Sequence, residues 1–296
     1  MANPGGSACS GRLIVMRVEL TTEPGDPAQP NEDYVSVALP ASGRGGVLVL
    51  LDGVTPPAGD DGCRHGVPWF TTALGGAMLE SSASRRHRTL ADSLTEAIDR
   101  TAAAHRTTCD LSHPRTPQAT AVAARWDEER LEYLVLSDSA LLLQRPDGAV
   151  TAVLDDRLDR LPAEVRAAGE AARALPRGSE ARAAATAEYT QAVEALRNAE
   201  GGFFTAAADP SVAERAVTGW VRRDRVRAAA ALTDGASRYV EVFGAGDWAD
   251  CFALLLREGP AGLVGRVRTA ERADADRTDF PRGKAQDDAS AALIEF

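Results

Sequence analysis

Three apolar segments of the sequence end in an aspartate that is followed by a small residue. These aspartates are Asp52, Asp138 and Asp234, and a fourth, Asp287, belongs to the Asp287-Asp288 pair that directly precedes the last apolar segment of the chain. A buried strand holds an acidic residue at its end rigidly, and a small neighbour lets the backbone approach a ligand closely. Carboxylates that converge at the edge of a sheet repel one another unless cations lie between them. The pattern therefore predicts a cation site built from oxygen ligands.

Hard divalent cations suit such a site. Mg²⁺ and Mn²⁺ prefer oxygen ligands and keep several waters, so a few aspartates and one backbone carbonyl can hold two ions without any histidine or cysteine. Two such ions can activate a water for in-line attack on phosphorus and neutralise the phosphoryl oxygens. The expected chemistry is the hydrolysis of a phosphate ester.

An alternative stays open at this point, because aspartate is one of the commonest turn residues. Asp61-Gly62 and Asp147-Gly148 are further Asp-Gly pairs of the sequence, and both are interpreted as turns. An unrelated α+β protein whose aspartates only shape turns would show the same dipeptides.

Length and composition exclude other classes of protein. A chain of 296 residues can bury one extensive core, so a single domain over 1–296 is expected. The net charge of −10 disfavours nucleic acid, which selects basic surfaces. No run of residues reaches the length of a membrane span, and the start of the chain lacks a signal-peptide pattern. A monomeric cytoplasmic protein without nucleic-acid or membrane partners is expected.

The sequence shows no zinc motif or disulfide framework. Its four cysteines are widely spaced, at Cys9, Cys63, Cys109 and Cys251. They form no paired motif, which favours a reducing compartment. His87, His105 and His113 show no spacing suited to zinc and are interpreted as surface residues.

The elements that would position these residues alternate between strands and helices. Short β-favouring runs predict strands at 13–20, 34–39, 47–51, 119–124, 131–136, 140–144, 149–154, 227–232 and 289–296. Apolar spacing predicts helices at 69–78, 90–105, 247–257 and 261–273, with another starting near Asp209. Turns at Trp126-Asp-Glu-Glu and Arg145-Pro-Asp-Gly suit hairpins, so the sheet should be antiparallel. The order fits an α+β sandwich, and the polar stretch 274–284 is expected to be mobile.

An insertion rich in alanine, arginine and glutamate interrupts this order at 158–200. High helix propensity and a break at Pro176-Arg-Gly predict two helices. A solvated helical hairpin is expected, and a partner-binding surface is the alternative.

Six motifs in sequence order resemble the type 2C, metal-dependent Ser/Thr protein phosphatases, the PPM family, in their bacterial form. The motifs are Asn31-Glu-Asp-Tyr, Leu51-Asp-Gly, Gln118-Ala-Thr-Ala-Val, Ser137-Asp-Ser, Leu232-Thr-Asp-Gly and Asp287-Asp-Ala-Ser-Ala-Ala. The resemblance covers nearly the whole chain. It implies a central β-sandwich of two antiparallel sheets flanked by helices, in an α-β-β-α arrangement, with two Mg²⁺ or Mn²⁺ ions in a cleft at one end.

The resemblance also implies roles for single residues. Asp52 would bridge both ions and the Gly53 carbonyl would bind one of them, while Asp234 and Asp287 would complete the second. Asp138 would hold a third ion, as in bacterial relatives.

Further expectations follow from the same resemblance. Glu32 and Asp33 would act through metal-bound waters, and residues 158–200 fall where the family carries a variable flap. The substrate would be a phosphorylated protein, and a Ser/Thr kinase would be the opposing partner.

The sequence departs from the family around the phosphate site. Ala28 stands where the family usually has an arginine that grips phosphate, and Val54-Thr-Pro-Pro replaces a glycine-rich continuation. Arg64 or Arg115 could replace the cation, although both also fit ordinary surface arginines. His65 could be the acid that protonates the leaving group, or simply a solvated loop residue. A phosphatase-fold binding or regulatory protein with weak or no catalysis is the alternative function.

Overall fold

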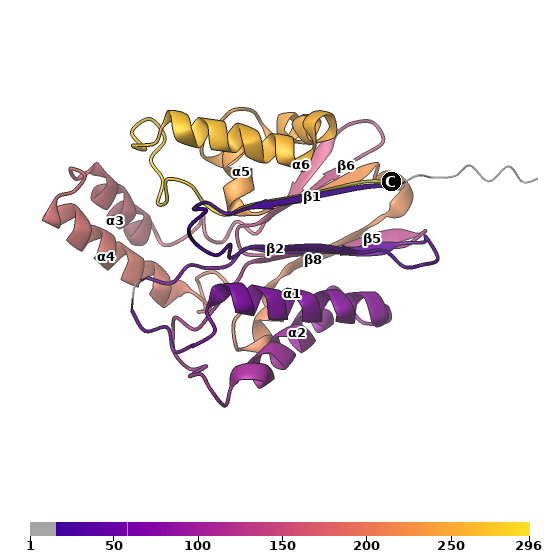
Figure 1. Ribbon diagram of the computed structural model, residues 1–296, viewed down its shortest axis with the longest axis horizontal. Coiled ribbons are helices and arrows are strands. Elements are labelled where there is room, and N and C mark those ends of the chain that lie inside the picture. Colours follow the sequence, from indigo (N-terminus) through magenta and orange to yellow (C-terminus); the bar gives the residue numbers. More distant parts are fainter. Residues whose placement is uncertain (1–15, 58) are drawn as a thin grey trace, which may run out of the picture.

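Two antiparallel sheets of five strands each face one another at the centre of the protein, in a computed structural model that describes residues 16–57 and 59–296 (Figure 1). The strands of the first sheet are, in spatial order, β1 (Arg17–Glu23), β10 (Ala289–Glu295), β9 (Ala228–Leu232), β6 (Ala140–Gln144) and β7 (Val150–Val153). Those of the second are β2 (Tyr34–Ala38), β3 (Gly46–Leu51), β4 (Ala121–Trp126), β5 (Arg130–Leu136) and β8 (Val217–Arg222). This confirms the predicted α+β sandwich.

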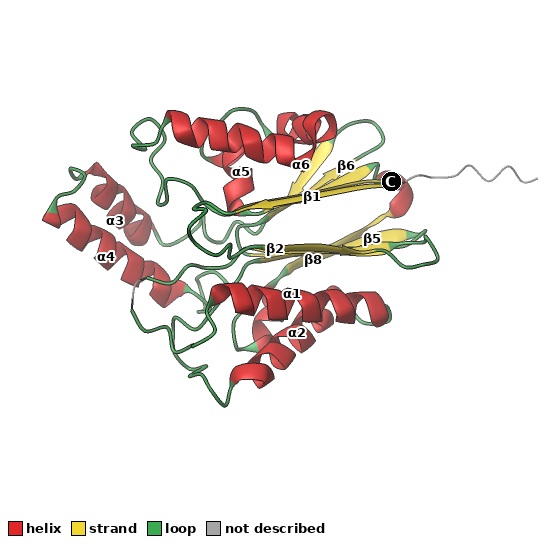
Figure 2. Ribbon diagram, in the orientation of Figure 1, coloured by secondary structure: helices red, strands yellow, loops and turns green. Residues whose placement is uncertain are grey.

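Helices cover the outer face of each sheet (Figure 2). The second sheet packs against α1 (Val67–Ser84) and α2 (Leu90–His105), and the first against α5 (Asp234–Glu241) and α6 (Trp248–Ala273). The α6 segment contains a break at Gly259, whose φ is 73° and which precedes Pro260, so it corresponds to the two helices predicted there. The result is a four-layer α-β-β-α arrangement.

The alternation of side chains along the central strands divides the core into layers. In β3, Val47, Val49 and Leu51 pack under the α1–α2 pair, whereas Leu48 and Leu50 fill the space between the sheets. All residues of β3 and β4 are buried, because each strand is covered on both faces. The strand ends are therefore held by packing on two sides.

Two further helices project from the sandwich at the end opposite the C-terminus (Figure 1). They are α3 (Ala163–Ala174) and α4 (Glu180–Leu196), which lie in the predicted helical insertion. The Ser179 hydroxyl caps α4 by accepting from the Arg182 N–H, and α4 has no fully buried residue. This solvated hairpin therefore adds little to the core.

Several details differ from the sequence predictions. The predicted helix near Asp209 is a 3-10 helix, Pro210–Arg215, and a second short one is Arg223–Arg225. The strand β8 was not predicted, because Gly219 interrupts its alternating pattern, and α5 was hidden behind the Asp-Gly turn signal. Residues 13–15 of the first predicted strand lie outside the described residues. None of the helices in the described ranges is long and apolar enough to cross a membrane.

The polar segment after α6 is organised by hydrogen bonds, contrary to the mobility predicted for 274–284. The buried Asp274 carboxylate accepts from the backbone N–H groups of Thr278, Asp279 and Phe280 and pairs with Arg282 at 2.6 Å. These contacts lower the pKa of Asp274 to about 2, although burial opposes the shift. The carboxylate therefore holds the segment that leads to Asp287.

The start of α5 lies against the chain that enters β10, and only a glycine fits at this contact. A Cβ on Gly235 would lie 1.9 Å from the Asp288 carbonyl oxygen, whereas one on the exposed Gly76 of α1 would meet nothing within 4 Å. We expect Gly235→Ala to lower the free energy of unfolding by about 1–3 kcal/mol through strain. The matched Gly76→Ala change should raise it by about 0.5–1 kcal/mol, because alanine favours the helix. Urea unfolding of both variants tests this, and equal effects would contradict the packing.

Candidate active site

The four predicted aspartates converge at one end of the sandwich. Asp52 follows β3, Asp138 lies between β5 and β6, Asp234 begins α5, and Asp287 precedes β10. All four line one pocket of about 250 Å³. The Asp234 backbone N–H donates to a carboxylate oxygen of Asp52 at 3.3 Å, which joins the ends of the two sheets directly.

The backbone around Asp52 is fixed from both sides. Its N–H donates to the Thr120 hydroxyl at 3.3 Å, and its carbonyl accepts from the Thr120 N–H at 2.9 Å. The next residue, Gly53, has no room for a side chain, since a Cβ there would lie 2.4 Å from Val67 and 2.5 Å from the Glu32 carbonyl oxygen. Glycine at this position therefore lets the Glu32 backbone pack closely against the chain that follows Asp52.

The aspartates are crowded and poorly solvated, and both effects raise the pKa values of their carboxyl groups. Burial, and then repulsion by Asp234 and Asp33, raises the pKa of Asp52 well above its usual range. Burial, with repulsion by Asp287 and Asp138, raises the pKa of Asp234 to about 7, and burial raises that of Asp138. A bound positive charge would therefore stabilise the ionised carboxylates of this cluster.

Asp33 is a further member of this acidic group. One of its carboxylate oxygens accepts from the Thr233 hydroxyl at 3.0 Å, while Oδ1 is buried and has no hydrogen-bond partner. Burial raises the pKa of Asp33 to about 8. A buried acceptor without a donor costs free energy unless a proton, a water or a cation reaches it.

Asp287 already has two cationic partners. The Lys284 ammonium lies 2.6 Å from its Oδ1 and the Arg238 guanidinium 2.8 Å from its Oδ2. Arg238 also binds Glu271 at 2.6 Å, and Glu271 in turn binds Arg268 at 2.8 Å. This buried chain of charges fixes the position of Asp287 and neutralises part of the site.

A second pocket of about 340 Å³ adjoins the first and shares Lys284 and Asp287 with it. Glu32 also lines it, and its carboxylate accepts from the Thr55 hydroxyl. The Asp288 carboxylate accepts from the backbone N–H of Glu32 at 2.7 Å and from that of Gly25 at 2.8 Å. Asp288 thus has a structural role, since it fastens the segment before β2 to the start of β10.

Comparison with known proteins places this site in a family. The sequence profile described as Protein phosphatase 2C matches residues 27–243. The chain belongs to the protein phosphatase 2C family. By family it is a hydrolase of the protein-serine/threonine phosphatase class. A search among curated proteins gave no matching relative.

Solved structures of this family share the fold. The Ser/Thr phosphatase Stp1 from Staphylococcus aureus is 13% identical, with 95% of each chain covered and a TM-score of 0.56. The Mycobacterium tuberculosis phosphatase PstP/Ppp is 17% identical, with 96% of this chain and 99% of that chain covered and a TM-score of 0.55. A PstP catalytic domain in complex with two manganese ions is also 17% identical, with 95% and 97% covered and a TM-score of 0.52.

The predicted phosphate-binding arginines and the predicted acid His65 of this phosphatase 2C chain lie outside the lining of the aspartate pocket. Arg115 makes two hydrogen bonds of 3.1 Å to the Glu194 carboxylate of α4, and Arg64 lies exposed in the loop before α1. The His65 ring stacks on Trp69, with ring centroids 4.4 Å apart. Ala28 brings no cation, and its N–H donates to the Asp26 side chain.

Two cations of the pocket were missed by sequence reasoning. Lys284 and Arg197 both line it, and burial lowers the pKa of Arg197. A signal for Lys284 was present, since it is the single lysine among the 33 basic residues. No comparable signal marks Arg197, because arginine is frequent throughout the insertion.

The prediction that His105 is a surface residue was wrong. His105 ends α2 and is 2% exposed, because the loops before α1 and after α2 close over it, whereas His87 is exposed as predicted. The cysteines form no paired motif in the sequence, but two of them meet in space. Cys63 and Cys109 lie together beside two histidines, although 46 positions separate them in the sequence.

Breaking the buried charge chain should destabilise the protein. Arg238→Leu leaves the side chain of Glu271, which is 0% exposed, with Arg268 alone and should cost on the order of 3 kcal/mol of unfolding free energy. The control is Arg266→Leu, which removes an exposed pair with Glu258 and should change stability little. Urea midpoints compare the two, and a stable Arg238→Leu protein would show that the chain of charges is dispensable.

Proposed function

We propose that this chain is a metal-dependent phosphatase that hydrolyses phosphoserine or phosphothreonine in proteins, with Mg²⁺ or Mn²⁺ at the aspartate pocket. The observation that carries the proposal is the convergence of Asp52, Asp138, Asp234 and Asp287 around one pocket in a protein phosphatase 2C chain. The two manganese ions of the PstP catalytic domain support the choice of metal.

The residues present fit such ions. The donors are all oxygen atoms, the raised pKa values of Asp52 and Asp234 reflect charge that a cation would relieve, and Asp33 Oδ1 lacks a partner. We assign Asp52 and the Gly53 carbonyl to the first ion. Asp234 and Asp287 would hold a second, with Asp52 shared.

The pocket has room for more than one ion. Asp138 borders both the aspartate pocket and another pocket of about 550 Å³, which suits a third ion at the edge of the site. When bound, the ions supply an activated water and neutralise the phosphoryl oxygens. The protein contributes a rigid arrangement of carboxylates at the ends of packed strands, which limits reorganisation during the reaction.

Side chains next to the ligands would orient water and protons. Thr233 donates to Asp33 and Thr55 donates to Glu32, and we infer that these two carboxylates would accept hydrogen bonds from waters near the ions. The predicted acid His65 has its ring Nδ1 turned toward the sulfur atoms of Cys63 and Cys109. Solvent is therefore the better source of the proton for the leaving alkoxide.

Lys284 is the best-placed substitute for the missing phosphate-binding arginine. It lies on the border of both pockets, is half exposed, and donates to the Thr55 hydroxyl at 2.8 Å. An ion at Asp287 would compete with the Lys284 ammonium for this carboxylate. The ammonium would then be free to bind a substrate phosphate. Arg115, by contrast, is held by Glu194.

The wider role follows from this chemistry. The substrate would be a phosphorylated protein, a Ser/Thr kinase would be the opposing enzyme, and the chain would act as a monomer in the cytoplasm of a bacterium. Val193 and Arg197, at the end of the projecting α3–α4 hairpin, line the pocket, which supports a role for the hairpin as a flap near the substrate.

Removing one ligand carboxylate should abolish the activity. We expect Asp52→Asn and Asp234→Asn to reduce Mn²⁺-dependent turnover of p-nitrophenyl phosphate and of a phosphothreonine peptide by at least about 100-fold, since each neutralises a proposed ligand. The matched control is Asp147→Asn in the remote Asp-Gly turn between β6 and β7, which should keep full activity. Retained activity in both site variants would refute the assignment.

Calorimetric titration of Mn²⁺ separates the proposal from its alternative. Binding that is lost in Asp52→Asn, together with turnover in the parent chain, supports the phosphatase. Binding without turnover would identify a phosphatase-fold binding protein. Absence of any Mn²⁺ binding would indicate that the aspartates only shape turns.

Replacing Lys284 tests the phosphate grip. A lost charge-assisted hydrogen bond is worth about 1.5–3 kcal/mol, so Lys284→Met should raise KM for the phosphopeptide roughly 10- to 100-fold, with a smaller change in kcat. Arg64→Met and Arg115→Met are the comparison variants and should leave KM nearly unchanged. A larger KM effect in either arginine variant would favour the cation first expected from the sequence.

A further inference from the structure

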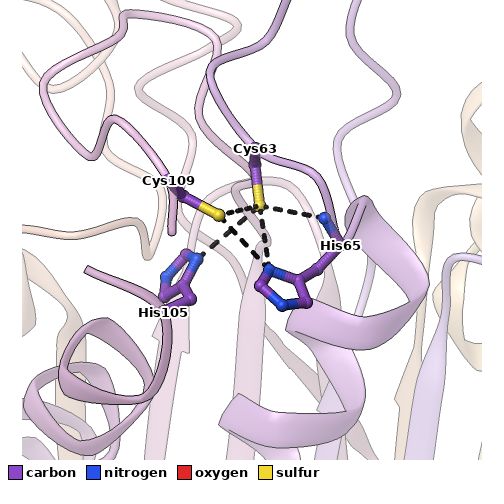
Figure 3. A group of neighbouring side chains, drawn as sticks. All are labelled: Cys63, His65, His105 and Cys109. Atoms are coloured by element: carbon purple, nitrogen blue, oxygen red, sulfur yellow. Dashed lines mark hydrogen bonds between the residues drawn. The ribbon is translucent and has the colours of Figure 1, made fainter. Parts of the chain in front are cut away.

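Four side chains of metal-binding type gather outside the aspartate pocket, in the loops beside α1 and α2 (Figure 3). They are Cys63, His65, His105 and Cys109, and their ligand atoms all lie within 4.8 Å of one another. No other group in the described part of the chain meets this criterion. Both thiols are free, and their sulfur atoms lie 3.4 Å apart, which is longer than an S–S bond of about 2.05 Å.

The spacing of these atoms matches the edges of a small tetrahedron. Cys63 Sγ lies 3.7 Å from His65 Nδ1 and 3.6 Å from His105 Nδ1, and Cys109 Sγ lies 3.3 Å from His65 Nδ1. With Zn–S near 2.3 Å and Zn–N near 2.0–2.1 Å, tetrahedral geometry requires about 3.6 Å between a sulfur and a nitrogen ligand and about 3.8 Å between two sulfurs. Two of the sulfur–nitrogen distances are close to this value, the third and the sulfur–sulfur distance of 3.4 Å are slightly shorter, and all four atoms lie within 4.8 Å of one another, so a small adjustment would let them bind one ion.

The local structure holds these ligands close together. A single residue separates Cys63 from His65 in the loop between β3 and α1, and the Cys63 N–H donates to the Asp61 carboxylate at 2.8 Å. His105 and Cys109 lie at the end of α2, where the Cys109 N–H donates to the His105 carbonyl at 3.0 Å. Trp69 of α1 flanks both imidazoles, with centroids 4.4 Å from His65 and 5.0 Å from His105.

The donor set of this cluster favours a different metal from the one expected at the aspartate pocket. Thiolate and imidazole ligands in a tetrahedral arrangement favour Zn²⁺ over Mg²⁺ or Mn²⁺, which prefer oxygen and six ligands. Four protein ligands leave no open position for a substrate, which is typical of a structural site.

We propose that Cys63, His65, His105 and Cys109 bind one structural Zn²⁺ ion that fastens the β3–α1 loop to the end of α2. Binding displaces one proton from each thiol and uses the neutral imidazoles through Nδ1, with their protons on Nε2.

The ion would stabilise one wall of the active-site region. The clamped loop starts at Gly53, which follows the ligand Asp52, and Thr55, Asp61 and Gly66 of this loop line the pocket that contains Lys284. Near the cluster, a backbone hydrogen bond from the Asp110 N–H to the Gly62 carbonyl at 2.8 Å joins the two loops, and the Val54 N–H donates to the Gln118 carbonyl at 2.9 Å nearer the aspartate pocket. A metal crosslink would reduce the number of conformations open to the two loops and so fix their relative position.

The test measures metal, so it does not depend on phosphatase activity. The full chain, purified under reducing conditions and without an affinity tag, should contain about one zinc per chain by mass spectrometry of the metal content. Cys63→Ser and Cys109→Ser should lower this at least about tenfold. Cys251→Ala in α6 and His87→Ala on the surface are matched controls that should keep the zinc.

A second measurement covers variants that fail to fold. Zinc is removed from the unmodified chain by a chelator, and Co²⁺ is added in its place. Tetrahedral two-sulfur, two-nitrogen coordination should give intense visible d–d absorption and a thiolate charge-transfer band, and zinc removal should lower the thermal midpoint. The proposal would be overturned by a substoichiometric zinc content whose removal leaves the thermal midpoint unchanged. An octahedral cobalt spectrum, or a Cys63–Cys109 disulfide in the zinc-free purified chain, would also overturn it.

Discussion

The repulsion among carboxylates at one end of the sandwich is the constraint on which the rest of the structure depends. Burial and proximity raise the pKa values of Asp52 and Asp234, so the folded chain carries unfavourable free energy there unless protons or cations compensate. The protein compensates part of this charge itself, through Lys284 and the buried Arg238 at Asp287. The remaining acidic oxygens are those left for a ligand.

Such a site persists only because its scaffold cannot relax. Asp52 and Asp234 follow β3 and β9, whose residues are all buried, and close contacts leave no room for side chains at the adjacent Gly53 and Gly235. Separation of the carboxylates would require the two sheets to part, which would expose the apolar layer between them. The hydrophobic core therefore maintains the electrostatic strain of the site, which is a common relation between stability and function.

The sequence predicted the parts of this arrangement that are encoded locally. The α2 helix and the β6 strand have the predicted boundaries, because amphipathic spacing and turn residues act over short distances. The acidic strand ends were also recognisable, since Asp followed by Gly or Ser is a local signal. By contrast, the partners of Arg115 and the buried state of His105 depend on loops distant in sequence. Lys284 was overlooked because its segment resembles an unstructured one, although Asp274 organises it.

The loop from Asp52 to α1 connects two kinds of coordination chemistry that the chain keeps apart. Its first residues belong to an oxygen-rich pocket suited to exchangeable hard cations, and its last residues belong to a sulfur and nitrogen cluster suited to a tightly held soft ion. The sulfur and nitrogen donors of the cluster would disfavour Mg²⁺ and Mn²⁺, which prefer oxygen ligands, so the cluster would not compete for the ions of the pocket. Pro56 and Pro57 restrict the backbone in the first half of this loop. The proposed zinc ion would hold its second half, so the prolines and the cysteine–histidine cluster would together limit movement of the pocket wall that begins at Gly53.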